Sequence, residues 1–280
     1  MNQQQMSILV VLYNKKIQDS VTLDSILQVT CKENLSLTII NNGPEKLSGI
    51  DDFINNHKDF KNINFYEFLE NRSLSKIYNN FLYDNQNAAF CIIFDDDSSF
   101  DSSLLLNVLK SNADIILPLI KNQKDSQIYY PISNNTIVTS ETALDINGLI
   151  SITSGLAISR KLINLMQNVY GPVFDENFAL YGIDTSFFAR LHRAREIHDK
   201  LSIISQDVVL HSLSRTGSQP ISNIRLRERL CDAALIARHY PDVKRLTYLL
   251  KKIVQNIYRG NFTNLYLLIK CYVTGKHPRS

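Results

Sequence analysis

The 280-residue sequence lacks the features that would assign it to several large classes of protein. Its four cysteines (Cys31, Cys91, Cys231 and Cys271) lie far apart and form no C-x-x-C pair, which argues against a zinc site or a disulfide framework. No run approaches 18 apolar residues, so we expect no transmembrane helix. The opening residues, MNQQQMSILVVLYN, have no basic stretch before a short apolar run and are unlike a signal peptide. We therefore expect a cytoplasmic protein.

Acidic residues are scarce near the end of the chain, although the whole composition, with 44% hydrophobic and 20% charged residues, is typical of a globular protein. Residues 224–280 contain 12 lysines and arginines against 3 acids, a formal charge of +9 in a chain whose net charge is +3. The rest of the chain is therefore acidic. A basic tail indicates contact with an anionic surface, such as a membrane leaflet or nucleic acid.

Short apolar runs alternate with segments of helical periodicity through the first 120 residues. Strands are expected at 7–13, 35–43, 63–69, 88–94 and 113–120, and helices at 19–30, 73–84 and 102–111. This alternation predicts an α/β fold with an open, mostly parallel sheet flanked by helices. Farther along we expect a loop or hairpin region at 121–150, helices at 161–170 and 184–196, and a strand that ends at His211.

The end of the chain is predicted to be helical. Residues 217–223 have the composition of a linker, which divides the chain into a domain of residues 1–216 and a basic helical extension of residues 217–280. Residues 246–258 place six apolar side chains on one helical face: Leu246, Leu249, Leu250, Ile253, Val254 and Ile257. Such a helix can lie on an anionic membrane surface. Packing on the first domain or on a second copy of the chain predicts the same pattern, and these alternatives stay open.

Three aspartates follow an expected buried strand in the stretch CIIFDDDSSF, residues 91–100. Asp95 and Asp97 are two positions apart and can share a face, where carboxylates suit Mg²⁺ or Mn²⁺. The alternative is a solvated turn in which Asp101 or Ser102 caps the next helix, and the serines at 98 and 99 are expected to begin that helix. The position of the aspartates after a core strand favours the metal site, because ligands bind beyond the carboxyl ends of parallel strands.

Other polar residues also follow expected strands and should meet at the same edge: Tyr13, Asn14, Asn41, Asn42 and Asn71. In NRSLSKIYNN, residues 71–80, a helix begins soon after a strand, and its free N–H groups could bind an anion. Capping of that helix by Ser73 or Ser75 is the simpler alternative.

Two further residues could carry chemistry. Asp184 opens a helix after the stretch FDENFALYGI and could act as a general base, or it could only cap that helix. His211 in VVLHSLSR could bind a metal or a phosphate, or only form a hydrogen bond.

Seven segments occur here in the order found in family 2 glycosyltransferases, which have the GT-A fold, and the chain resembles that family over about residues 6–215. They are VVLYN (10–14), LTIINNGP (37–44), NRSLSKIYNN (71–80), IIFDDDS (92–98), SGLAISRKL (154–162), FDENFALYGIDTSFFARL (174–191) and VLHSLSR (209–215). The sequence departs from the family pattern at Ser73, where glycine is common, and at Ile183, where glutamate is common.

The resemblance implies a role for each matching residue. Asp95 and Asp97 correspond to the D-x-D pair, and with His211 they would bind a divalent metal, Mn²⁺ or Mg²⁺, on the donor diphosphate. Asp184 would be the catalytic base. The nucleotide-sugar would contact Tyr13, Asn14, Asn41, Asn42, Asn71, Leu74, Asn79, Asp95 and Asp96.

The function implied is that of an inverting hexosyl- or deoxyhexosyltransferase of cell-surface polysaccharide synthesis, such as lipopolysaccharide or capsule. It would move a sugar from a UDP- or dTDP-sugar to a hydroxyl of a saccharide or lipid-linked acceptor, at or near the inner face of a bacterial plasma membrane, with no nucleic acid partner. One alternative is a sugar-nucleotide nucleotidyltransferase, which the absence of glycine from VLYNKKIQDS disfavours. The other is a non-catalytic nucleotide-sugar-binding protein.

Overall fold

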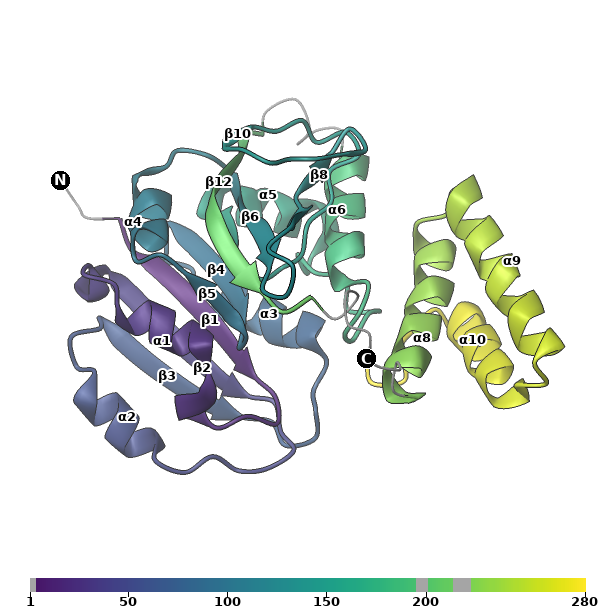
Figure 1. Ribbon diagram of the computed structural model, residues 1–280, viewed down its shortest axis with the longest axis horizontal. Coiled ribbons are helices and arrows are strands. Elements are labelled where there is room, and N and C mark those ends of the chain that lie inside the picture. Colours follow the sequence, from purple (N-terminus) through teal and green to yellow (C-terminus); the bar gives the residue numbers. More distant parts are fainter. Residues whose placement is uncertain (1–3, 195–200, 214–222) are drawn as a thin grey trace.

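The computed structural model describes residues 4–194, 201–213 and 223–280, and its centre is a mixed sheet of ten strands covered by helices (Figure 1). The sheet strands are β1 (Met6–Leu12), β2 (Leu35–Asn41), β3 (Asn62–Glu67), β4 (Phe90–Asp95), β5 (Ser98–Phe100), β6 (Ile115–Asn122), β7 (Ile128–Tyr130), β10 (Thr142–Ala143), β11 (Leu156–Ser159) and β12 (Ile203–His211). A separate hairpin consists of β8 (Ile132–Ser133) and β9 (Thr136–Ile137). The expected α/β class and the hairpin region are confirmed.

The strand order is β10-β12-β6-β11-β4-β1-β2-β3, with β5 paired to β12 and β7 to β6. β3, β2, β1 and β4 are parallel to one another, and β12 is parallel to β6. β11 runs antiparallel between β4 and β6, so the sheet is mostly parallel but mixed. Because β1 pairs in parallel with both β2 and β4, the carboxyl ends of these strands meet at one edge.

The helices are α1 (Val21–Leu27), α2 (Ile50–Asn56), α3 (Leu74–Asp84), α4 (Ser103–Lys110), α5 (Arg160–Tyr170), α6 (Ile183–Arg193), α8 (Asn223–His239), α9 (Val243–Tyr258) and α10 (Phe262–Thr274). Each expected helix within the described residues is confirmed. α2 was not expected, because its sequence IDDFINN has few apolar residues and none of them is fully buried.

The core lies on both faces of the sheet, as the side chains of β1 show. Ile8, Val10 and Leu12 pack in one cluster with α1 and α4, whereas Leu9 and Val11 pack in the other with α3 and α6. Strands buried on both faces read as continuous apolar runs, which is why SILVVL identified β1 from the sequence.

One expectation about the segment after β4 is wrong. The serines at 98 and 99 do not begin a helix but lie in β5, whose residue Ser98 pairs with His211 at the end of β12. Of the two suggested caps of α4, it is Asp101 that bonds, since its Oδ1 accepts the N–H of Ser103 at 2.9 Å. A short strand whose partner is more than a hundred residues away leaves no periodic signal in its own sequence.

The C-terminal helices α8, α9 and α10 form an appendage beside α6, with α9 farthest from the sheet (Figure 1). The Tyr240 hydroxyl, just after α8, donates to Asp175 Oδ2 at 2.6 Å and accepts from Arg190 Nε at 3.1 Å. At the end of the chain, the N–H of His277 donates to the Asn177 carbonyl at 2.9 Å. The predicted linker covered residues 217–223; residues 217–222 and the predicted domain boundary lie outside the described residues, and Asn223 begins α8. None of the described helices has the length and hydropathy of a membrane-spanning helix.

Replacing Tyr240 with Phe should destabilise the protein by about 1–3 kcal/mol, because Asp175 is buried and would lose a hydrogen-bond donor. The free energy of unfolding in urea measures the effect. Tyr258→Phe is the matched control, since that side chain is 91% exposed. Equal stability of the two variants would show that the Tyr240–Asp175 bond does not fasten the appendage.

Candidate functional site

The candidate site is built on the turn between β4 and β5, at the edge where the parallel strands end. Hydroxyl groups from other segments hold this turn: Ser154 Oγ accepts the N–H of Asp95 at 3.0 Å. Thr22 Oγ1, from α1, donates to the Asp95 carbonyl at 2.6 Å and accepts the N–H of Ser98 at 2.9 Å. The backbone that presents the aspartates is therefore fixed on both sides.

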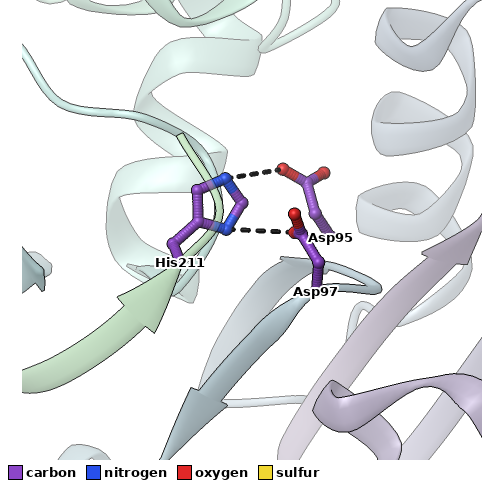
Figure 2. Close-up of side chains that lie close together, drawn as sticks. All are labelled: Asp95, Asp97 and His211. Atoms are coloured by element: carbon purple, nitrogen blue, oxygen red, sulfur yellow. Dashed lines mark ion pairs between the residues drawn. The ribbon is translucent and has the colours of Figure 1, made fainter. Parts of the chain in front are cut away.

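Asp95, Asp97 and His211 come together at this turn, as the family resemblance implied (Figure 2). His211 Nδ1 lies 3.1 Å from Asp97 Oδ1, and Nε2 lies 3.9 Å from Asp95 Oδ2. Nδ1 is also 2.9 Å from Ser98 Oγ, which in turn lies 2.6 Å from Ser154 Oγ. When Nδ1 carries the proton, this N–H group faces Asp97 Oδ1 and Ser98 Oγ, and the lone pair of Nε2 faces Asp95.

The electrostatics of the site show a surplus of negative charge. Desolvation by the surrounding protein raises the pKa of Asp95 to about 7, although 41% of its side chain is open to solvent. His211 lowers this pKa, and the neighbouring charges of Asp97, Asp184 and Asp96 raise it further. Burial opposes the protonated form of His211, but the hydrogen bond to Asp97 and the nearby carboxylates outweigh it and raise its pKa. The nearby carboxylates contribute to both shifts, whereas burial is the main cause of the Asp95 shift.

These residues fit a divalent cation by their chemistry. One donor atom from each of Asp95, Asp97 and His211 can be chosen so that all lie within 4.8 Å of one another. Two carboxylates and one imidazole suit Mn²⁺, and carboxylates with water suit Mg²⁺. The side chains of Asp95 and Asp97 are 41% and 32% exposed, which leaves room for ligands from solvent or substrate.

Asp96 has a different environment from its two neighbours. Its Oδ1 pairs with Lys15 Nζ at 2.6 Å, and its Oδ2 accepts the N–H of Tyr13 at 3.2 Å. Ser20 Oγ donates to its carbonyl at 3.1 Å. The middle aspartate therefore ties the loop after β1 to the end of β4, and its contact with a nucleotide stays a prediction.

Asp184 lies at the N-terminus of α6, where the helix dipole favours negative charge. Gly182 precedes the helix with φ of 81°, and a Cβ there would lie 1.7 Å from Asp232 Oδ1 of α8, so glycine is needed at this position. The N–H of Thr153 donates to Asp184 Oδ1 at 3.1 Å and orients the carboxylate. Its charge contributes to the pKa shifts of Asp95 and His211, so it acts on the same site.

The two asparagines at the end of β2, Asn41 and Asn42, are buried rather than open to solvent. Asn41 Nδ2 donates to the Glu45 carbonyl at 2.7 Å and to Glu67 Oε1 at 2.9 Å. Asn42 Nδ2 donates to Asn71 Oδ1 at 3.3 Å and to a backbone carbonyl, whereas its Oδ1 is buried without a hydrogen-bond partner among the described residues. Of the two, Asn42 thus retains an unused acceptor.

The remaining predicted nucleotide residues have structural contacts, and their contact with a nucleotide stays a prediction. Tyr13 and Asn14 are exposed on the loop after β1, and Asn14 has φ of 50°. The N–H of Leu74 donates to the Ala179 carbonyl, and Asn79 bonds both backbone groups of Phe174.

Neither serine at the start of α3 caps that helix. The hydroxyls of Ser73 and Ser75 both donate to the Phe178 carbonyl, which ties α3 to the segment before α6. The first N–H group of α3 is likewise used by that segment, through Ala179. One N–H group at this helix N-terminus is therefore already used, and anion binding by the others stays a prediction.

Four residues that shape the site were not found from the sequence: Lys15, Thr22, Ser98 and Ser154. Lys15 directly follows the predicted loop residues Tyr13 and Asn14, and Ser98 and Ser154 lie in segments that carry the family resemblance, although no role was assigned to them. The roles of Thr22, Ser98 and Ser154 depend on hydroxyl contacts between distant segments, which local sequence does not reveal.

No protein-family model and no curated protein matches this sequence. The fold does match solved glycosyltransferases. Against S. aureus TarS 1-349 the TM-score is 0.57 at 12% identity, covering 99% of this chain and 93% of that one. Against the complex of TarS 1-349 with UDP-GlcNAc it is 0.56 at 13% identity, covering 86% and 69%. Against GalNAc-T7 with UDP, GalNAc and Mn²⁺ it is 0.55 at 12% identity, covering 85% and 51%.

These likenesses show that the fold is GT-A-like, as the sequence predicted. They are likenesses of fold, because every identity is below 15%. The chain matches only 39% of the length of a longer TarS structure, so the activity of that whole protein does not transfer with the fold.

Asp97→Asn should weaken Mn²⁺ binding at least about tenfold, because it removes a charged donor from the candidate site. Electron paramagnetic resonance titration of free Mn²⁺ measures the affinity directly. The control is Asp101→Asn, a nearby exposed aspartate outside the cluster. Unchanged Mn²⁺ affinity in Asp97→Asn would contradict the assignment of the metal site.

Proposed function

We propose that the protein is an inverting glycosyltransferase of family 2 that uses a nucleotide-diphosphate sugar and a divalent metal. The observation that carries this proposal is the meeting of Asp95, Asp97 and His211 at the carboxyl edge of a GT-A-like sheet. Asp184 is a carboxylate oriented by the Thr153 N–H, and its charge acts on Asp95. A metal site and a separate base are what a single-displacement sugar transfer requires.

A UDP- or dTDP-sugar is the proposed donor. The TarS and GalNAc-T7 structures contain UDP or UDP-GlcNAc, which supports a uridine nucleotide. In this chain, Asn42 Oδ1 is buried without a hydrogen-bond partner among the described residues, and rotation of the side chain toward the site would present an acceptor to the N–H of a pyrimidine base. Tyr13, exposed on the loop after β1, offers a ring for contact with that base.

The proposed reaction is one displacement at the anomeric carbon. The hydroxyl oxygen of the acceptor forms a bond to this carbon as the bond to the diphosphate oxygen breaks, and Asp184 takes the hydroxyl proton. The Thr153 N–H holds the carboxylate in one orientation, and the N-terminus of α6 favours its ionised form. Attack from the face opposite the leaving group inverts the configuration.

Asp95, Asp97 and His211 are the residues that would hold the metal. When bound, a divalent cation would offset the negative charge that develops on the leaving diphosphate. Among the described residues, Lys15 pairs with Asp96, and His211 lies against Asp95 and Asp97. Lys15 keeps Asp96 in place and so preserves the loop that carries Tyr13.

The proposed acceptor is a hydroxyl of a saccharide or of a lipid-linked saccharide in cell-surface polysaccharide synthesis. This part rests on the ordered family 2 motifs of the sequence and on the likeness of fold to TarS. A screen of nucleotide-sugars in the presence of Mn²⁺ tests the donor: the correct one should raise the midpoint of thermal unfolding and release its nucleoside diphosphate. At a hundred times its dissociation constant, a ligand stabilises the folded state by about 2.7 kcal/mol.

Asp184→Asn should lower transfer by roughly 10²–10⁴-fold and leave donor binding near normal, because the amide cannot accept the proton but can still accept the Thr153 N–H. Turnover and donor affinity are measured separately, the latter by calorimetry. Asp51→Asn, on the exposed side of α2, is the control. Full turnover in Asp184→Asn would remove this residue from the mechanism, and donor binding without turnover in the unmutated protein would favour a non-catalytic binding protein.

A further inference from the structure

Helix α9 exposes a continuous apolar stripe that the fold does not use. Val243, Leu246, Leu250, Val254 and Ile257 follow one another at spacings of three and four, which places them on one face, and they are 38–78% exposed. The sequence pattern grouped Leu249 and Ile253 with them. In the structure the buried residues of α9 are Leu249 and Asn256, on an adjoining face, and the stripe is left in solvent.

Helix α10 exposes a second stripe. Phe262, Tyr266, Ile269 and Val273 have the same spacing and are 45–70% exposed, whereas Leu268 and Cys271 are buried. Single exposed apolar residues are common on soluble proteins, but contiguous stripes mark an interaction surface. The α9–α10 hairpin therefore presents apolar surface on both of its helices, at the end of the appendage away from the sheet (Figure 1).

The charge around these stripes has one sign. Residues 243–280 contain eight lysines and arginines and no aspartate or glutamate. Arg245 and Arg279 bond within the protein, to Asp242 and Glu228. The side chains of Lys244, Lys251, Arg259, Lys270 and Lys276 lie in exposed positions of the hairpin and the segment that follows it.

We propose that the α9–α10 hairpin docks on the surface of an anionic lipid bilayer. The apolar stripes would enter the interface while the lysines stay at the level of the acidic headgroups, as in amphipathic helices that lie on membranes. Exposed tyrosines suit that boundary, since their rings are apolar and their hydroxyls polar: Tyr258 and Tyr266 are 91% and 66% exposed.

Charge complementarity favours a membrane over a second copy of the chain. Two hairpins packed stripe to stripe would bring basic residues together without a carboxylate from either hairpin to pair with them. An anionic leaflet supplies the opposite charge everywhere along the surface. The proposal does not depend on glycosyl transfer, so it can fail while the proposed function holds, and the reverse.

Co-sedimentation of the full chain with vesicles tests the proposal. Vesicles of phosphatidylglycerol and phosphatidylcholine should pellet the protein, and vesicles of phosphatidylcholine alone should pellet far less. Raising the salt concentration should release it, because the electrostatic part of the attraction is screened. Light scattering without lipid should give the mass of one chain.

Leu250→Ser together with Val254→Ser should weaken binding to the anionic vesicles by at least about a hundredfold, because two exposed apolar side chains no longer enter the interface. The matched control is Ile137→Ser with Val169→Ser, two similarly exposed apolar residues of the first domain. All four side chains are partly in solvent, and unchanged thermal unfolding confirms that the variants fold.

Lys244→Gln together with Lys251→Gln should weaken binding to the anionic vesicles by roughly thirtyfold, since each lysine near an anionic surface strengthens binding by a factor of about five to six. Lys58→Gln with Lys124→Gln, on the first domain, is the control. The proposal is overturned by equal binding to both kinds of vesicle, by no binding to either, or by full binding of the hairpin variants. A dimer without lipid that Leu250→Ser and Val254→Ser dissociate would overturn it in favour of a second copy.

Discussion

Repulsion among carboxylates at the end of β4 is the constraint around which the site is arranged. Asp95, Asp96 and Asp97 leave the strand together, and Asp184 adds a fourth charge within range. The three aspartates have different partners. Asp96 pairs with Lys15 of the loop after β1, whereas Asp95 and Asp97 face His211. Such a cluster is costly to bury without a cation, and its place at the carboxyl edge of the sheet supports the proposed metal site.

Much of the fold was predictable because its strands are buried on both faces and its helices are amphipathic. The run FCIIF identified β4, and the two-residue spacing of Asp95 and Asp97 predicted that they act together. His211 could be placed only by resemblance, since it reaches the aspartates through the pairing of β12 with β5. That pairing, the role of Ser98 and the bond from Lys15 to Asp96 are long-range contacts, which local periodicity does not encode.

The packing of the C-terminal appendage could not be predicted from local sequence either. Its sequence predicted basic amphipathic helices, but whether their apolar faces are buried depends on packing within the bundle. Only part of each face is used there. The bundle contacts the region of α6 through Asp232 of α8, which lies beside Gly182, and through the bonds among Tyr240, Asp175 and Arg190. The helix that carries Asp184 is therefore in direct contact with the bundle whose outer helices are proposed to meet the membrane.

The assignment of the site is decided most directly by crystals grown with Mn²⁺ and UDP, with anomalous diffraction used to locate the ion. We expect a single strong manganese peak about 2.0–2.6 Å from oxygens of the aspartates, with the diphosphate beside it and the pyrimidine base near Tyr13 and Asn42. A manganese peak away from Asp95, Asp97 and His211, or UDP bound elsewhere on the protein, would contradict the assignment.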